Sequence, residues 1–508
     1  MTSFYRNIIF FSLLSIFYAS YIEIDSSLVL NYNIDKKAVL IPNYDNISSN
    51  FKVEFLNKNR NFFIFCNLGY IVDNSFNINL SPLVKYKNFR FKANLDYLVN
   101  NQSEFYENNW NGIFDLLEKI EYLDLSIFNN KINFFIGEIN NLTFGHGYLL
   151  NNYGNNHNTP IDKNLGLIFN FHNKNRSVEY SAFLSNLEDV INSSGLIGHH
   201  ISLLFSESWP MRFGFGHVVD LDQFINYNDD FNLPIRQLNS FEFDFDFPLS
   251  ESSFYKILFI GEISAIKLPE SRYYKRVDDS QFTNDKKSRK GIWGVAFPGF
   301  KYTNDRYDFK LALNYNSAIY SPYYFNKTYD FEKIRYRIYN IESNESLYPD
   351  EENLLKMFES SDNQIFVPKD IYSMINGYEN THPTFGFSSS FGARINRKSK
   401  LNISYSYFRD LNNDSNPLSF NTILVDLFLK DYFFSIFTEL DLYFSKNFFE
   451  SSEFNTLNES MMYGANLSFK LFENLSLYSD YKVTFYDIDL DGSIDKINYI
   501  NAGLEIHY

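Results

Sequence analysis

The chain has 508 residues, including 56 Phe, 39 Tyr and 3 Trp, and this aromatic-rich composition excludes an intrinsically disordered protein. Lys and Arg total 45 against 61 Asp and Glu, a net charge of −16, whereas nucleic-acid-binding proteins usually carry a basic surface; nucleic acid is not expected as a partner. The single cysteine, Cys66, permits neither an internal disulfide nor a cysteine-based zinc site. Beyond the N-terminus no apolar run approaches the roughly 20 residues of a spanning helix, which excludes a polytopic helical membrane protein.

The N-terminal residues have the layout of a secretory signal peptide. Arg6 supplies a positive charge, residues 8–18 are largely apolar, and Ala19 and Ser20 follow. This apolar stretch is too short to cross a bilayer comfortably as a helix. We therefore expect residues 1–20 to be a signal peptide, in preference to a buried N-terminal strand.

From about residue 50 onward, apolar and polar residues alternate, which is typical of strands with two chemically different faces. In the clearest case, residues 241–247, four Phe alternate with Glu242, Asp244 and Asp246. Helical periodicity would scatter these residues around a cylinder, so strands are predicted. The same alternation occurs in residues 76–80, 89–97, 309–315, 401–407 and 463–469.

Two all-β architectures fit alternating strands. A soluble sandwich would bury the apolar faces in a core, but large aromatics on nearly every strand would overfill a small one. A transmembrane barrel turns the apolar faces towards lipid and the polar faces towards a wet lumen. The opposite faces here carry charges of both signs, which favours the transmembrane antiparallel barrel.

The C-terminal residues 500–508 alternate in the same way and end on an aromatic residue. With the signal peptide and the repeated alternation, this ending resembles bacterial outer-membrane β-barrel proteins. The resemblance implies an outer-membrane location, lipid contact, and recognition by the barrel assembly machinery; it names no solute and leaves a homo-oligomer open. The assembly signal is expected on Leu504, Ile506 and Tyr508. Segments 132–153 and 293–300 also look like uncharacterised outer-membrane proteins.

Residues 21–508 are expected to form one barrel domain. Allowing about 25 residues per strand with its connection gives roughly 16 to 20 strands. Residues 75–85 are expected to form a hairpin with residues 88–98, and residues 383–396 one with 399–410. Their short turns fit the periplasmic side, where barrel connections are tight.

Three longer connections stand out. Residues 268–290 are charge-dense and predict an extracellular loop. Residues 317–383 lack good alternation and include a candidate short helix at 349–360; this stretch could narrow the pore or project outward. Residues 140–160 are rich in Asn and Gly and predict a turn-laden excursion.

Catalysis is not expected, and no catalytic residue is assigned. His146 lies between two glycines and His199 adjoins His200, but neither has the Ser or Asp partners of a hydrolase that we can identify. Polar turn or lumen positions are the simpler interpretation. Metal binding by both adjacent histidines is disfavoured, because neighbouring strand residues point to opposite faces.

The segment from Asp487 to Asp495 partly matches a calcium-binding loop, with carboxylates at Asp487, Asp489, Asp491 and Asp495. The bidentate Glu of such loops is replaced by Asn498, and the flanks predict strands. An acidic turn between the last two strands is therefore favoured over a weak calcium site, and no other cofactor is expected.

The charged residues on the polar strand faces are candidates for the lumen lining, where rings of fixed charge set ion preference. They predict a porin-like channel for passive diffusion of ions or small polar solutes, with a modest cation preference. The alternative is an adhesin or receptor barrel that binds partners through its long loops. The lumen candidates are Arg90, Lys92, Asp96, Glu242, Asp244, Asp246 and Lys310.

Overall fold

The structure of the protein is a computed structural model. It describes residues 47–55, 62–71, 75–93, 95–99, 117, 119–139, 142–155, 165–206, 209–223, 235–267, 273–278, 281–285, 292–317, 320–326, 329–338, 364–368, 383–396, 399–411, 419–432, 437–449, 457, 461–472, 475–486 and 494–507. The expected signal peptide and the candidate helix at 349–360 lie outside these residues.

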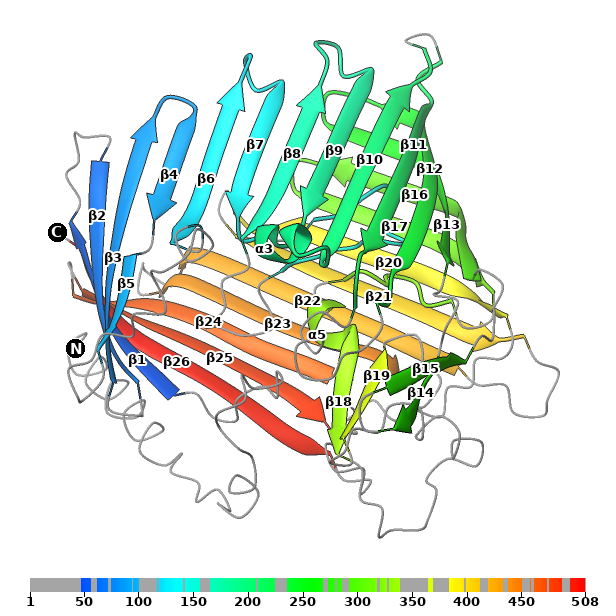
Figure 1. The fold of residues 1–508 in the computed structure, drawn as a ribbon. Helices are drawn as coiled ribbons and strands as arrows, with labels where there is room; N and C mark the ends of the chain where they lie inside the picture. Colours follow the sequence, from blue (N-terminus) through cyan, green and yellow to red (C-terminus); the bar gives the residue numbers. More distant parts are fainter. Residues whose placement is uncertain are drawn as a thin grey trace.

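The described chain is nearly all strand, and 22 strands form one sheet. Neighbouring strands pair antiparallel around the sheet, and the last strand, β26, pairs in parallel with β1, so the hydrogen-bonded ladder forms a ring (Figure 1). The expected antiparallel barrel is confirmed. The sheet consists of β1 (Ile47–Phe55), β2 (Phe62–Ile71), β3 (Ser75–Tyr86), β4 (Phe89–Ala93), β5 (Leu95–Val99), β6 (Ile120–Ile127), β7 (Ile132–Gly137), β8 (Gly166–His172), β9 (Val178–Leu184), β10 (Leu196–Leu204), β11 (Arg212–Asp220), β12 (Leu238–Glu251), β13 (Tyr255–Lys267), β16 (Ile292–Asn304), β17 (Tyr307–Asn316), β20 (Thr384–Arg394), β21 (Lys400–Asp410), β22 (Ser419–Tyr432), β23 (Phe437–Phe449), β24 (Met461–Phe472), β25 (Leu475–Tyr486) and β26 (Asp495–His507).

Because β4 and β5 both pair with β3, they count as two pieces of one strand, which leaves 21 strands, one more than the upper end of the 16 to 20 expected. Both predicted hairpins are present, as β3 with β4 and β5, and as β20 with β21. Because the strands alternate in direction, the turns after β3 and β20 lie on one rim of the ring, and the connections after β7, β13 and β17 lie on the other. We call these the tight-turn rim and the long-loop rim.

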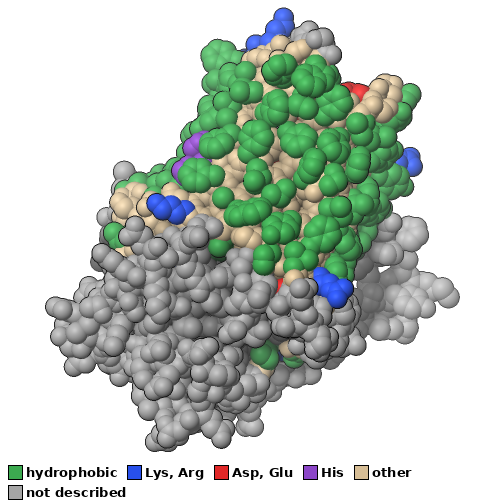
Figure 2. Space-filling model, turned by 90° about the vertical axis from the view of Figure 1, so that its right-hand side faces the viewer, with side chains coloured by type: hydrophobic (Ala, Val, Ile, Leu, Met, Phe, Trp, Pro, Cys, Tyr) green, Lys and Arg blue, Asp and Glu red, His purple; other side chains and the backbone are tan. Residues whose placement is uncertain are grey.

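The two faces of the wall differ as the alternation predicts. On β12 the side chain of Phe243 is 44% exposed, whereas that of its neighbour Glu242 is 1% exposed and points inward. Figure 2 shows one side of the wall covered by hydrophobic side chains, with charged ones at its margins. A continuous apolar surface of this kind on a closed barrel is the lipid-facing band of a membrane-spanning barrel. Exposed large hydrophobic residues of this wall include Phe215, Phe241, Phe243, Ile263, Trp293, Phe309, Leu311, Leu313 and Phe385.

The long-loop rim carries further structure. Within the expected loop 268–290, β14 (Tyr273–Asp278) and β15 (Gln281–Asp285) form a separate hairpin. The connection 317–383 contains the short helix α5 (Tyr329–Glu332) and a second hairpin of β18 (Ile334–Ile338) and β19 (Gln364–Pro368). In the described part of the chain, no helix is long and apolar enough to cross a bilayer.

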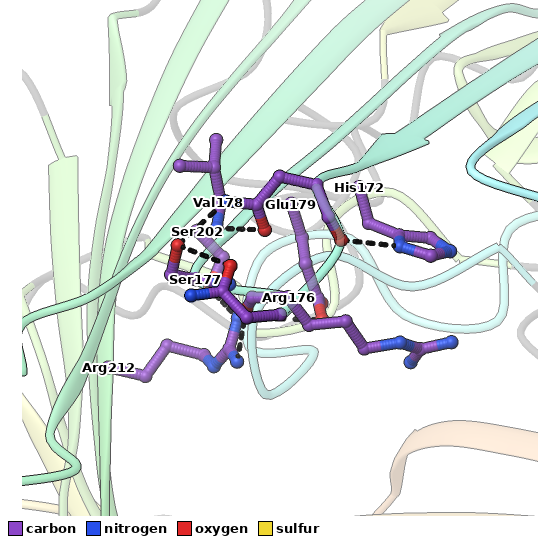
Figure 3. A network of polar contacts seen from close by, with 9 residues as sticks. His172, Arg176, Ser177, Val178, Glu179, Ser202 and Arg212 are labelled. Atoms are coloured by element: carbon purple, nitrogen blue, oxygen red, sulfur yellow. Dashed lines mark hydrogen bonds and ion pairs between the residues drawn. The ribbon is translucent and has the colours of Figure 1, made fainter. Parts of the chain in front are cut away.

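On the tight-turn rim, Arg212 at the start of β11 stabilises the turn between β8 and β9. Its guanidinium donates to the carbonyl oxygen of Arg176 (2.9 Å) and lies 3.6 Å from the carboxylate of Glu179 (Figure 3). Within the turn, the side-chain amide of Asn173 donates to the hydroxyl of Ser177 (2.7 Å). These contacts connect the start of β11 to the turn between β8 and β9.

Candidate functional site

Two connections from the long-loop rim fold into the barrel. The first inner segment is residues 142–155, between β7 and β8; the second is residues 320–333, between β17 and β20, of which 327–328 are not described. They pair with each other: the amide of Phe325 donates to the carbonyl of Leu149 (3.1 Å), and that of Asn151 donates to the carbonyl of Phe325 (2.9 Å). We call the two segments together the plug.

The plug is held against the wall by an apolar core inside the ring. Phe144, Leu149, Tyr153 and Phe325 are almost completely buried. They belong to one cluster with inward side chains of strands β9 to β17, namely Phe183, Leu196, Val218, Leu238, Ile266, Ile292, Ala296 and Ala312. On this side the alternation predicted a wet lumen, but the inward residues near the long-loop rim are apolar and pack against the plug.

A polar network ties the second inner segment to β11 and to the first. Tyr329 of α5 donates its hydroxyl to Asp220 at the end of β11 (2.7 Å) and accepts from the side chain of Gln223 (3.1 Å). Burial, together with the charge of Asp220, raises the pKa of Tyr329 well above its usual value, which keeps the hydroxyl protonated as a donor. Tyr153 of the first segment donates to Asp330 (2.6 Å).

Deeper in the barrel, one carboxylate anchors the first inner segment. Glu262 of β13 accepts hydrogen bonds from the backbone amides of His146 (2.8 Å), Tyr148 (3.0 Å) and Leu149 (3.2 Å). Lys310 of β17 donates to the carbonyl oxygen of His146 (2.6 Å). The turn that offers these groups has Gly145 and Gly147 at positive φ, a backbone conformation that glycine adopts without strain.

Next to this anchor, Glu242 and Asp244 of β12 meet His200 of β10. His200 Nε2 lies 2.7 Å from the carboxylate of Asp244, and the ring of Phe144 stacks on the imidazole at 5.6 Å. Ligand atoms of His200, Glu242 and Asp244 all lie within 4.8 Å of one another. As predicted for adjacent strand residues, His199 points the other way, towards Tyr180 and His217.

The predicted lumen residues fall into separate places. Glu242, Asp244 and Lys310 come together under the plug, while Asp246 stands opposite Arg212 in the ladder. Their role in ion passage stays a prediction.

Arg90 and Lys92 lie elsewhere, near the tight-turn rim. Arg90 forms an ion pair with Asp124, and Lys92 forms one with Glu121 (2.6 Å). Asp96 lies on β5 opposite Asn79, and its side chain is outside the described part.

The calcium-loop and assembly-signal predictions remain untested. Asp487, Asp489 and Asp491 lie outside the described residues, and Asp495 is described only as the first residue of β26. Leu504 and Ile506 lie on β26, with side chains outside the described part, as is Tyr508.

Sequence reasoning did not single out Glu262, and for His200 it predicted no more than a polar turn or lumen position. Glu262 interrupts an otherwise apolar stretch of β13, and this isolated charge is the one signal that could have drawn attention to it. Its partners lie more than 110 residues away in the chain, beyond the reach of any local pattern.

Comparison with known proteins gives only distant structural likeness. No family model matches the chain, and no curated protein matches it. Among solved structures, it is similar to the FrpB iron transporter of Neisseria meningitidis (TM-score 0.34, 9% identity, 88% of this chain and 74% of that one). It is also similar to OccAB1 of Acinetobacter baumannii (TM-score 0.33, 8% identity, 82% of this chain and 93% of that one). A third similar structure is the outer membrane protein OprD of Pseudomonas aeruginosa (TM-score 0.29, 6% identity, 79% of this chain and 88% of that one). These values carry no functional argument.

Proposed function

We propose that the protein is an outer-membrane, porin-like channel through which ions or small polar solutes diffuse passively. The observation that carries the proposal is the inward folding of two long connections into a lipid-facing barrel. A ring of this many strands encloses more space than its wall side chains fill, and barrels of about 22 strands hold additional chain inside. The plug then acts as the constriction that sets the size of the solute.

The plug is eccentric in its described contacts, which supports a passage beside it. Its apolar core packs on strands β9 to β17, and its farthest described side-chain contact is from Tyr323 to Ser406 on β21 (3.1 Å). We infer that solutes pass between the plug and the wall formed by the remaining strands. In that position one side of the plug would be held by the wall, and the opposite side would determine the width of the pore.

The proposal includes the modest cation preference expected from the net charge of −16. Rings of carboxylates in a pore favour cations. Glu242 and Asp244 are covered by the plug, so we assign the preference to more accessible inward carboxylates such as Asp246, which is half-buried. Asp246→Asn is expected to lower the cation-to-anion permeability ratio, measured as a reversal potential, and Glu242→Gln to leave it unchanged.

Conductance of the refolded protein in planar bilayers tests the channel itself. Wild type should give discrete steps. In a second variant, a short Gly-Ser linker replaces residues 144–150, which carry the three backbone amides that bind Glu262. This variant should give larger conductance steps, because the first inner segment loses its anchor. If neither wild type nor the linker variant gives conductance steps above background, the proposal is contradicted.

A second candidate, a receptor or adhesin barrel, is favoured by one observation. The long-loop rim carries two hairpins, β14 with β15 and β18 with β19, that stand outside the main sheet. Structured connections at the rim of a barrel can present a binding surface. Binding to host or phage surfaces that is lost when residues 273–285 are deleted, in a protein without conductance, would favour this function over the channel.

A further inference from the structure

We propose that His200, Glu242 and Asp244 form a binding site for one divalent transition-metal ion, at the interface between the plug and the barrel wall. This site is independent of the proposed channel. The three side chains offer one imidazole nitrogen and carboxylate oxygens, and these ligand atoms lie within 4.8 Å of one another. Ligands of one zinc ion stand about 3 to 4 Å apart at bond lengths of about 2.0 to 2.2 Å, so small side-chain rotations bring all three onto one ion.

The ladder register explains why these three side chains converge. His200 of β10 pairs with Gly216 of β11, which pairs with Glu242 of β12. Asp244 is two residues further along β12 and therefore lies on the same inward face. The middle strand contributes only glycines to this row, so the side chains of its two neighbours meet across it.

The glycines of β11 leave the space that the ligands occupy. A Cβ atom added at Gly216 would clash with the carboxylate oxygen Oε1 of Glu242, and one at Gly214 would clash with Oδ2 of Asp244. Both contacts are far below van der Waals distance. The sequence Gly-Phe-Gly in β11 thus keeps an inward recess for the carboxylates while its phenylalanine, Phe215, faces outward.

Glu242 is the observation that points to a cation. Its side chain is 1% exposed, and neither of its carboxylate oxygens accepts a hydrogen bond from a donor among the described residues. The polar group within hydrogen-bonding reach is another carboxylate, that of Glu262. An ionised carboxylate without a compensating partner in a buried site is strongly unfavourable. Its neighbours Glu262 and Asp244 are acidic as well, so the surroundings add repulsion where compensation is needed.

The cationic groups nearby do not balance these charges. Lys310 donates a hydrogen bond to the carbonyl oxygen of His146, and its positive charge interacts with the carboxylate of Glu262. Even a protonated His200 would compensate only Asp244, with which it is in contact. A divalent ion bound by His200, Asp244 and Glu242 would compensate the negative charges of Asp244 and Glu242 together.

The ligand types select the class of metal. Imidazole nitrogen with carboxylate oxygen suits first-row transition ions such as Zn²⁺, whereas Ca²⁺ and Mg²⁺ prefer oxygen ligands throughout. The first inner segment covers the site, since Phe144 stacks on His200 and Gly145 lies against Asp244. Metal binding would therefore neutralise the surface on which the plug rests.

The test measures zinc binding directly on the full-length protein refolded in detergent. After EDTA treatment and dialysis against micromolar ZnCl₂, wild type should retain one Zn²⁺ per chain by mass spectrometry of the metal. His200→Gln and Glu242→Gln should each weaken zinc affinity at least about tenfold. His199→Gln is the matched control, because it removes the neighbouring histidine from the outer face of the same strand, and it should bind as wild type does.

Two results would overturn the proposal: wild type that retains no zinc, or zinc binding that survives both ligand substitutions. The first would indicate that Glu242 and Glu262 share a proton instead of a cation. X-ray absorption at the zinc edge keeps the test valid even if a variant misfolds, since wild-type zinc should show nitrogen and oxygen ligands with a single imidazole. Two or more imidazoles would place the ion elsewhere. Channel conductance is not a readout here, so failure of this site leaves the proposed function standing.

Discussion

Removing the Glu262 carboxylate should release the first inner segment without unfolding the barrel. In wild type this side chain accepts from three backbone amides, those of His146, Tyr148 and Leu149. Glu262→Ala leaves these three donors without their acceptor, and each buried unsatisfied donor costs about 1–3 kcal/mol. Because water can enter the space that the side chain leaves, the lower end of that range applies to each donor, which gives about 3 kcal/mol for the three donors together.

Hydrogen exchange by mass spectrometry measures this release. Since about 1.4 kcal/mol corresponds to a tenfold change in an equilibrium constant, peptides covering residues 142–155 should exchange about 100-fold faster in Glu262→Ala. Peptides from β21 to β25 should exchange as in wild type, because the ladder hydrogen bonds of these strands are unchanged.

Two further variants make the result specific. Glu262→Gln keeps an oxygen for two of the amides and should fall between wild type and Glu262→Ala. Glu251→Gln removes a carboxylate at the end of β12 that lies 3.8 Å from Lys256 and is largely exposed; such surface pairs contribute little, so no change is expected. Equal exchange of residues 142–155 in wild type and Glu262→Ala would refute the anchoring role.

Two predictions test the two faces of the wall. Gly214→Ala places a methyl group against the carboxylate of Asp244 and should lower the free energy of unfolding of the barrel by about 1–3 kcal/mol, seen as unfolding at a lower temperature by heat-dependent gel migration. Gly392→Ala, where the added methyl group would lie 3.3 Å from its nearest neighbour, should be tolerated. Phe243→Lys puts a charge on the lipid-facing surface and should cost about 2–4 kcal/mol near the bilayer midplane, seen as a lower refolding yield in lipid vesicles. Phe254→Lys, at the exposed turn between β12 and β13, should refold like wild type, and a similar loss in both lysine variants would argue against a lipid-facing band.

The amino-acid sequence by itself determined the wall of this barrel. Alternation in residues 241–247 specifies a strand with one apolar and one polar face, and the structure places Phe243 outward and Glu242 inward as predicted. Hairpins could be read from the same pattern, because a strand and the next strand along the chain are joined by a few turn residues. These features depend on neighbours in the chain.

Only the tertiary structure decided what fills the barrel. The polarity of residues 317–383 allowed an inward or an outward path, and contacts such as that of Tyr329 with Asp220, 109 residues apart, place residues 320–333 of this stretch inside the barrel. The meeting of His200 with Asp244 likewise requires β11 to lie between their strands with glycine on its inner face. Closing a ring brings together side chains that no local periodicity relates, because their proximity depends on strand order and register across the whole sheet.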